Sequence, residues 1–175
     1  MDTVSIKEED DLFARFDALG ITYENHAHPP LHTVSESQTL RGSLPGAHVK
    51  NLFLRDKKKR IWLATVLEDR DVDLKALKRR LGGSGSLSFG SPDLLMEVLG
   101  VIPGAVTPYG VINDADKRVT VVLDQGLLAF DQVNAHPLRN DRTVTIATGG
   151  LLGFLADEGY DPVMVDFGRP LDEGQ

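Results

Sequence analysis

The fold is decided by two apolar runs, Leu52-Phe53-Leu54-Arg55 and Ile61-Trp62-Leu63-Ala64-Thr65-Val66-Leu67. Both are rich in the branched and aromatic side chains that strands favour. The segment between them is polar and has the length of a hairpin turn, so the two runs should pair antiparallel. The cluster Lys57-Lys58-Lys59-Arg60 then lies at the tip of the hairpin.

Upstream of this hairpin the pattern predicts a helix, a strand and a second helix. Ser5 and Glu8 have capping-box spacing, and apolar residues then recur at helical intervals from position 12 to 19, where Gly20 ends the pattern. We expect three further elements before Gly46: a strand Ile21–Glu24, a loop His26–Pro30 and a short helix Thr33–Leu40, which Gly42 to Gly46 breaks.

Downstream, glycines and prolines mark where each expected element ends. We expect helices over Asp73–Leu81, from Ser91-Pro92 to Gly100 and over Leu151–Glu158, strands over Ser86–Phe89, Val119–Leu123, Thr143–Ala147 and Val163–Val165, and a loop Val101–Gly110. Strands and helices alternate without a regular βαβ repeat. The predicted fold is therefore mixed α/β (α+β), with a mixed, mostly antiparallel sheet surrounded by helices.

Composition excludes several classes of protein. The chain has 175 residues and 41% hydrophobic content, which fits one globular domain over residues 1–175 with a core from about 5 to 168. It has no cysteine, so disulfides, thiolate zinc ligands and a cysteine nucleophile are absent. No leader or membrane-spanning run is evident, and we expect a cytoplasmic protein without a cofactor or membrane partner.

The formal charge of −7 argues against non-specific DNA binding. The basic residues are nevertheless clustered, since two groups within 24 positions hold eight of the 19, namely Lys57-Lys58-Lys59-Arg60 and Lys75, Lys78, Arg79 and Arg80. These clusters are either solvated turn and helix faces or contacts to an RNA substrate. In the second interpretation, the tRNA-binding residues are Lys57, Lys58, Lys59, Arg60, Arg79 and Arg80.

Common catalytic motifs are missing: there is no phosphate-binding P-loop, dinucleotide fingerprint, H-E-x-x-H or G-x-S-x-G sequence. His26, His28 and His32 are close in sequence, but their spacing matches no usual metal site. We therefore predict loop histidines and no metal.

Three polar segments are candidates for a site. Lys50-Asn51 precedes the first strand of the hairpin, where side chains often line a pocket. The loop from Gly104 to Pro108 lets backbone N–H groups approach a ligand. His136 to Asn140 places an imidazole, a guanidinium and an amide ahead of a strand. Each segment alone also fits an ordinary strand edge, turn or loop.

Their order along the chain is more specific. The run Lys50-Asn51-Leu52-Phe53-Leu54 is followed by Gly100-Val101-Ile102-Pro103-Gly104-Ala105-Val106-Thr107-Pro108-Tyr109-Gly110, and then by His136-Pro137 with Asn140. This sequence closely resembles the YbaK-like, prolyl-tRNA-synthetase-associated editing family. Within that family it is most similar to the free-standing, alanine-specific members called PrdX or ProXp-ala.

The resemblance implies hydrolysis of the ester between an amino acid and the terminal adenosine of tRNA, without metal. It implies an essential role for Lys50, a position against the ester for the loop from Gly104 to Pro108, and a place in the same site for His136. Substrate-binding residues implied in this way are Asn51, Ala105, Val106, Thr107, Pro108 and Asn140. The implied partners are aminoacylated proline tRNA and, as a second candidate, prolyl-tRNA synthetase.

The expected mechanism follows from these groups. Loop N–H groups would stabilise negative charge on the ester carbonyl, and Lys50 would anchor the ribose-phosphate or the α-amino end. Either a tRNA hydroxyl or His136 would activate water. A pocket sized for a methyl group excludes proline sterically, which makes alanine the leading substrate, with cysteine or serine as alternatives. Two other hypotheses are a non-catalytic nucleic-acid-binding module and a degenerate member used for protein assembly.

Overall fold

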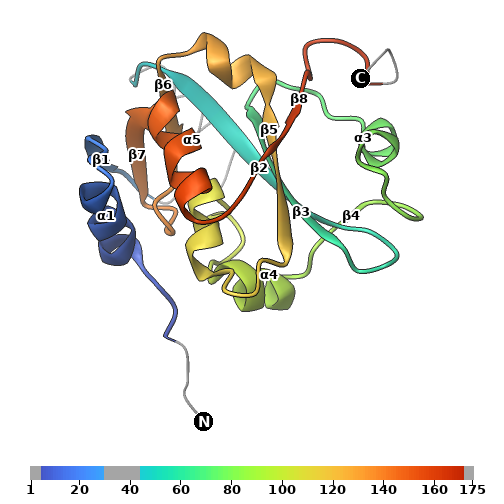
Figure 1. Cartoon of the computed structure of the whole chain (residues 1–175), viewed down its shortest axis with the longest axis horizontal. Coiled ribbons are helices and arrows are strands. Elements are labelled where there is room, and N and C mark those ends of the chain that lie inside the picture. Colours follow the sequence, from blue (N-terminus) through green and yellow to red (C-terminus); the bar gives the residue numbers. More distant parts are fainter. Residues whose placement is uncertain (1–4, 30–43, 172–175) are drawn as a thin grey trace.

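The computed structural model describes residues 5–29 and 44–171, and its centre is a mixed sheet of eight strands (Figure 1). The strand order is β1-β7-β6-β2-β3-β5-β8, and β4 pairs with β2. The strands are β1 (Tyr23–Ala27), β2 (Ala47–Arg55), β3 (Ile61–Leu67), β4 (Ser88–Phe89), β5 (Val119–Asp124), β6 (Gln132–Ala135), β7 (Arg142–Ala147) and β8 (Val163–Val165). The helices are α1 (Glu9–Ala18), α3 (Leu74–Leu81), α4 (Pro92–Leu99) and α5 (Thr148–Asp157), with 3-10 turns η1 (Pro108–Asn113) and η2 (Gln125–Ala129).

The hairpin of β2 and β3 confirms the prediction from the two apolar runs. Its antiparallel register pairs residues 49–55 with residues 61–67, and β3 has the predicted bounds. Strand β2 begins at Ala47, five residues earlier than expected, because polar side chains in its first half hide the strand pattern. Lys50 and Asn51 therefore lie inside the strand and not ahead of it, which corrects their expected position.

The sheet is mixed and mostly antiparallel, as predicted. Four strand pairs in the described residues are antiparallel, namely β1–β7, β2–β3, β2–β4 and β6–β7. The pairs β2–β6, β3–β5 and β5–β8 are parallel. Strand β1 is shifted from the predicted Ile21–Glu24, so His26 lies in a strand and not in a loop.

Strand β6 was not predicted, because two of its four residues are amides. Asn134 in this strand is only 3% exposed, and its Nδ2 donates to the carbonyls of Pro45 and Ala47 at 2.9 and 3.1 Å. Its Oδ1 accepts from Thr145 Oγ1 at 2.5 Å. These bonds satisfy the buried amide, and they hold β6 between β2 and β7.

Most helices end where the sequence signals predicted. Asp73 caps α3, and Ser91 caps α4 ahead of Pro92. Both helices end at a glycine with positive φ, Gly82 at 70° and Gly100 at 67°, a conformation that glycine adopts without steric cost.

Two helix starts differ from the prediction. Helix α1 is capped by Glu8, whose N–H donates to Asp11 Oδ2 at 2.9 Å, and not by the expected pair Ser5 and Glu8. Helix α5 begins at Thr148, three residues before the expected start, since Gly149 and Gly150 obscure its first turn. The expected helix Thr33–Leu40 lies outside the described residues.

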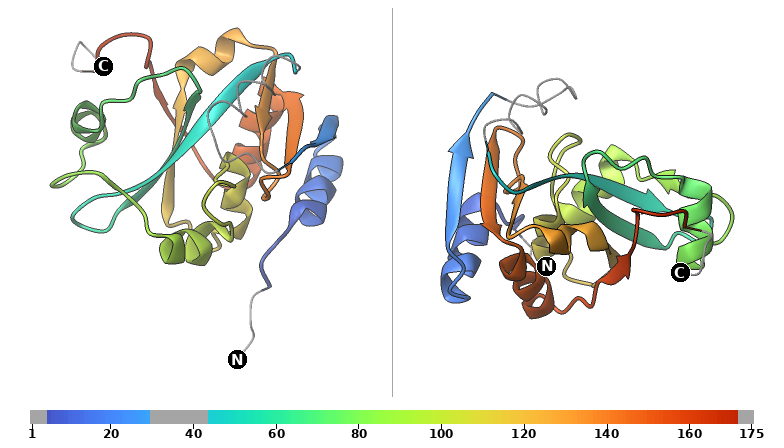
Figure 2. Two further views of the ribbon diagram at one scale, coloured as in Figure 1. Left: turned by 180° about the vertical axis from the view of Figure 1, so that it is seen from behind. Right: turned by 90° about the horizontal axis from the view of Figure 1, so that it is seen from above.

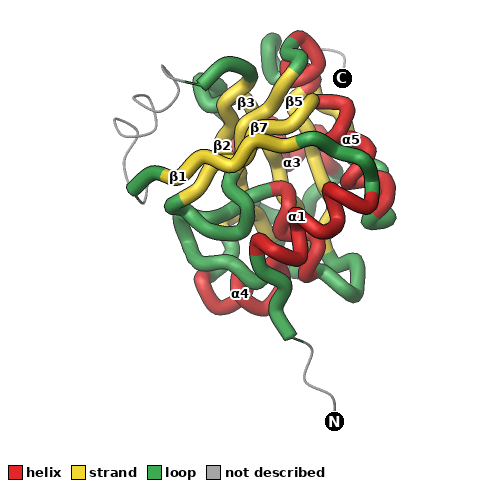
Figure 3. Tube along the Cα trace, turned by 90° about the vertical axis from the view of Figure 1, so that its left-hand side faces the viewer, coloured by secondary structure: helices red, strands yellow, loops and turns green. Residues whose placement is uncertain are grey.

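Side chains on the two faces of the central strands enter two different cores. Ile61 and Leu63 point into a core shared with α1, α4 and α5. Trp62, Ala64 and Val66 alternate with them and pack against α3. Helices α1 and α5 lie on the same side of β1 and β7 (Figure 2, right), and α1 runs beside these strands in Figure 3. The opposite face of β1 and β7 is therefore covered by neither α1 nor α5.

No helix among residues 5–29 and 44–171 is long and apolar enough to cross a membrane.

Candidate functional site

The parallel register of β2 and β6 brings Lys50 and His136 to the same face of the sheet. The two strands pair only through Ala47 with Val133 and His48 with Asn134. Lys50 and His136 each follow the second of these pairs by two residues. Because side chains alternate along a strand, both point to the face that carries His48 and Asn134, opposite α1 and α5.

Asn51 points to the other face, where it contacts the loop after α4. Its Nδ2 donates to the Val106 carbonyl at 3.0 Å, and its Oδ1 accepts from Thr65 Oγ1 at 2.6 Å. Thr65 is the cross-strand partner of Asn51 on β3. The structure thus brings Asn51 and the loop together, at the place where β2 no longer pairs with β6.

The Lys50 ammonium is held by a fixed carbonyl group. Its Nζ donates to the backbone oxygen of Arg70. Arg70 in turn binds the fully buried carboxylate of Asp124, with Nε 2.9 Å from Oδ2, and this bond raises the arginine pKa. The same Asp124 oxygen accepts from the Leu67 N–H at 3.0 Å. Lys50 is therefore positioned by its own strand and by the turn that follows β3.

The loop from Gly104 to Pro108 is only partly available to a ligand. Gly104 has φ of 92° and is exposed, and Val106 is half-buried, whereas the side chains of Ala105, Thr107 and Pro108 are buried. The Ala105 N–H already donates to the Ile102 carbonyl at 3.0 Å.

The remaining donors of this loop are three backbone N–H groups. Those of Gly104, Val106 and Thr107 have no partner among the described residues. Thr107 also caps the turn η1, since its Oγ1 accepts from the Tyr109 N–H at 3.3 Å. The loop can therefore offer backbone donors from a rigid frame.

His136 keeps one ring nitrogen for chemistry. Its Nδ1 lies 2.8 Å from the Arg142 carbonyl, which can only accept, so Nδ1 carries the proton. Nε2 has no partner in the described part of the chain. Burial lowers the His136 pKa, and the ring of His28, 6.1 Å away, lowers it further. A neutral imidazole at pH 7 then presents an Nε2 lone pair that can accept a proton.

His28 is a neighbour that the sequence did not assign to the site. Its Nδ1 is 2.8 Å from the Pro29 carbonyl, and its Nε2 is 2.8 Å from Thr143 Oγ1. Both nitrogens are engaged, so of these two imidazoles only His136 has a free nitrogen.

The turn between β6 and β7 places Asn140 beside the loop. A Cβ atom added at Gly104 would lie 3.5 Å from Asn140 Nδ2. Arg139 fixes this turn, because its guanidinium donates to both oxygens of Asp141 at 2.5 and 2.6 Å and to Glu9 of α1 at 2.9 Å. This bond to Arg139 lowers the Asp141 pKa. No local sequence pattern indicates the long-range partner Glu9.

The two basic clusters of the sequence form one surface. Asp56 links them, since its carboxylate accepts from Arg60 Nε at 2.9 Å and from the Ser84 N–H at 3.0 Å. Arg60 also donates to the Gly82 carbonyl at 3.0 Å, which lies at the end of α3. The hairpin tip and the end of α3 are therefore adjacent, although they are about twenty residues apart in sequence.

The ester hydrolysis that the family resemblance implies should survive EDTA. Neither the sequence spacing of the histidines nor the described residues provide a group of three side chains that could hold a metal; His32 lies outside those residues. The measurement is the deacylation rate before and after dialysis against EDTA. A lost activity that zinc restores would contradict the prediction.

Comparisons with known proteins identify the family to which the chain belongs. The model of the aminoacyl-tRNA editing domain matches residues 28–154, a range that includes Lys50, the 104–108 loop and His136. The chain belongs to the aminoacyl-tRNA editing domain family. It is 40% identical over 159 residues to prolyl-tRNA synthetase associated domain-containing protein 1 of Bos taurus, with 89% of this chain and 92% of that protein covered.

A bacterial relative and two solved structures extend the similarity. Prolyl-tRNA editing protein ProX of Acetoanaerobium sticklandii is 39% identical over 137 residues, covering 78% of this chain and 83% of that protein. The crystal structure of a hypothetical protein superposes with a TM-score of 0.70 at 19% identity, covering 91% of this chain and 98% of that chain. A proposed trans-editing enzyme for prolyl-tRNA synthetase has a TM-score of 0.68 at 20% identity, covering 93% and 98%. These structures establish the shared fold.

Proposed function

We propose that this editing domain is a free-standing deacylase that removes alanine from mischarged proline tRNA. The observation that carries the proposal is that β2 directs Lys50 to the face shared with His136, while the adjacent Asn51 binds the 104–108 loop, which has unpaired backbone N–H groups. A cation, a proton acceptor and carbonyl-binding donors are the parts that ester hydrolysis requires. Family membership and the name of the ProX relative support an aminoacyl-tRNA substrate.

The mechanism assigns one task to each group. Backbone N–H groups of Gly104, Val106 and Thr107 bind the ester carbonyl and stabilise the oxyanion that forms when water attacks. Lys50 holds the anionic or oxygen-rich terminal ribose end. His136 Nε2 accepts the proton of the attacking water, either directly or through a ribose hydroxyl of the tRNA, and a proton passes to the ester oxygen of the ribose as its bond to the acyl carbon breaks.

Two amides support this arrangement. Asn51 anchors the loop through the Val106 carbonyl, and Asn140 lies beside Gly104. Ala105, Thr107 and Pro108 contribute shape and rigidity through buried side chains. The half-buried Val106 is the loop side chain best placed to limit the volume of the aminoacyl group.

The substrate proposal predicts strong selectivity for the amino acid. Alanyl-tRNA for proline should be hydrolysed at least about a hundredfold faster than the prolyl form, because a small pocket excludes the proline ring. The measurement is single-turnover deacylation of both tRNAs, with cysteinyl and seryl forms as further substrates. Equal rates for alanine and proline contradict the size mechanism, and no hydrolysis of any form contradicts the deacylase proposal.

The proposed partner is the tRNA itself, bound in part by the joined basic surface of Lys57, Lys58, Lys59, Arg60, Arg79 and Arg80. Phosphate contacts would offset the repulsion between an acidic protein and RNA. A prolyl-tRNA synthetase is the second proposed partner, and the cytoplasm is the proposed location.

A further inference from the structure

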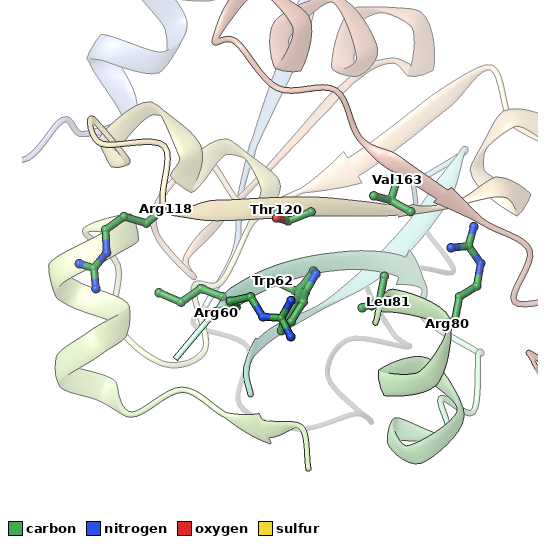
Figure 4. A pocket seen from close by; sticks show the side chains of 8 residues that line it. Arg60, Trp62, Arg80, Leu81, Arg118, Thr120 and Val163 are labelled. Atoms are coloured by element: carbon green, nitrogen blue, oxygen red, sulfur yellow. The ribbon is translucent and has the colours of Figure 1, made fainter. Parts of the chain in front are cut away.

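An arginine-lined pocket lies at the edge of the joined basic surface. It has a volume of about 340 Å³, and its lining includes Arg60, Arg80 and Arg118 around Trp62 and Thr120. Figure 4 shows Arg118 at one end and Arg80 at the other, with Arg60 and Trp62 between them. Arg60 lies over the indole ring, with its Cζ 5.5 Å from the ring centroid. Three elements far apart in sequence thus contribute one row of guanidinium groups.

Each guanidinium has donors left for a ligand. Arg118 uses NH1 for Glu97 at 2.7 Å, and Arg60 uses Nε and NH2 for protein acceptors. Arg80 differs from both, because no carboxylate pairs with it among the described residues. Its NH2 donates weakly to the Met164 carbonyl at 3.4 Å, and its buried Nε has no partner there. An arginine has five N–H donors, so an anion in the pocket would find several of them free.

The pocket and Lys50 lie on the same face of the sheet. Thr120 is opposite Trp62 on the neighbouring strand, and Trp62 is opposite Leu54. Lys50 precedes Leu54 by four residues on β2 and therefore shares its face. At about 3.3 Å per residue, Lys50 and Leu54 are separated by about 13 Å along β2. Helix α3 covers this face between Trp62 and Val66, so a polymer that ends at Lys50 would pass around α3 to reach the arginines.

From this geometry we infer that the pocket of Arg60, Arg80 and Arg118 binds backbone phosphates of the tRNA acceptor stem. The inference rests on the proposed function for its choice of polyanion, and it adds Arg118, which neither basic cluster of the sequence contains. A row of separate guanidinium groups fits a chain of phosphates better than it fits one small anion. The bound stem then directs its aminoacylated end toward Lys50.

The test uses uncharged proline tRNA and two substitutions, Arg80→Gln and Arg118→Gln. Arg15→Gln is the matched control, since the side chains of Arg15 and Arg118 are both 41% exposed and both pair with a carboxylate. Dissociation constants are measured by fluorescence anisotropy between 50 and 200 mM salt. We expect each pocket variant to bind about fivefold more weakly at low salt and to reduce the salt slope by about 1, with Arg15→Gln unchanged.

A second measurement separates this inference from the proposed activity. The alanyl ester of the trinucleotide CCA is too short to cover the pocket, so Arg118→Gln, which lies outside both basic clusters, should hydrolyse it at the wild-type rate. Wild-type affinity and salt slope in both variants would overturn the inference, as would polyglutamate competing as well as tRNA. If the wild-type protein binds tRNA in this way but hydrolyses no ester, the proposed function fails and the phosphate pocket stands.

Discussion

Replacement of Lys50 by alanine should reduce single-turnover deacylation of alanyl-tRNA at least about a hundredfold, while the protein stays folded. The ammonium lies on the face shared with His136 and is held by the Arg70 carbonyl. Loss of a preorganised charged donor from a site typically costs this much or more. Lys50→Arg should also be slow, because a planar guanidinium does not occupy the position of a compact ammonium.

Two controls make the Lys50 result specific. Lys50→Met retains most of the aliphatic side chain opposite Val66 on β3, so it tests the charge if the alanine variant is unstable. Lys117→Ala removes a lysine on the other side of the protein, where it contacts Tyr160, and should leave the rate unchanged. Near-normal rates in both Lys50 variants would contradict the role of the cation, and a collapsed melting temperature in both would make that role structural.

His136→Ala should slow deacylation about a hundredfold or more, in the range expected for loss of a general base. The wild-type rate should fall in acid with a midpoint below the ordinary histidine pKa of about 6.5, since burial lowers the His136 pKa. The sign follows because protonation below that midpoint removes the Nε2 lone pair. The unfolded chain binds this proton more readily, so stability also decreases as the pH falls below about 6.5.

The measurement is the pH dependence of single-turnover rates for wild type and variant, between pH 5 and 8. His26→Ala is the control, because this histidine pairs with Glu24 on β1 and should affect neither rate nor profile. A substrate lacking the free ribose hydroxyl distinguishes direct activation of water from activation through the tRNA. An unchanged acidic limb in His136→Ala would contradict its role as the proton acceptor.

Elements with complete local signals could be predicted from the sequence. Strand β3 is a continuous apolar run between polar segments, and α3 and α4 have a capping side chain at one end and glycine at the other. These features act within a few residues, so the sequence alone contains them. The strand β8 was located for the same reason.

Elements stabilised by distant partners were missed or misplaced. Strand β6 depends on Asn134, whose amide is satisfied by carbonyls almost ninety residues away. The first half of β2 has polar side chains on both faces of the sheet, since Lys50 and Asn51 point to opposite faces. No local pattern indicates such pairings, since each polar residue is stabilised by a partner that only the folded chain supplies.

The residues of the candidate site likewise divide into those that local motifs predict and those that depend on distant contacts. The order of the three segments pointed to Lys50, Gly104 and His136, whereas the roles of Arg70, Thr65 and His28 depend on contacts made across the sheet. The resemblance also placed the whole 104–108 loop against the ester, but the structure buries three of its five residues, Ala105, Thr107 and Pro108. Sequence motifs thus predict the segments of the candidate site, and the fold shows which of their side chains are buried.

The ion pair between Arg139 and Glu9 connects helix α1 to the turn between β6 and β7. Arg139 belongs to the turn that holds Asn140, and Glu9 opens α1, so the two segments are joined at a point 130 residues apart in the chain. Local openings in proteins occur in cooperative units. A fluctuation that lifts the start of α1 from the body of the protein would also release the turn, and order beside Gly104 is therefore limited by how firmly the N-terminal helix is docked.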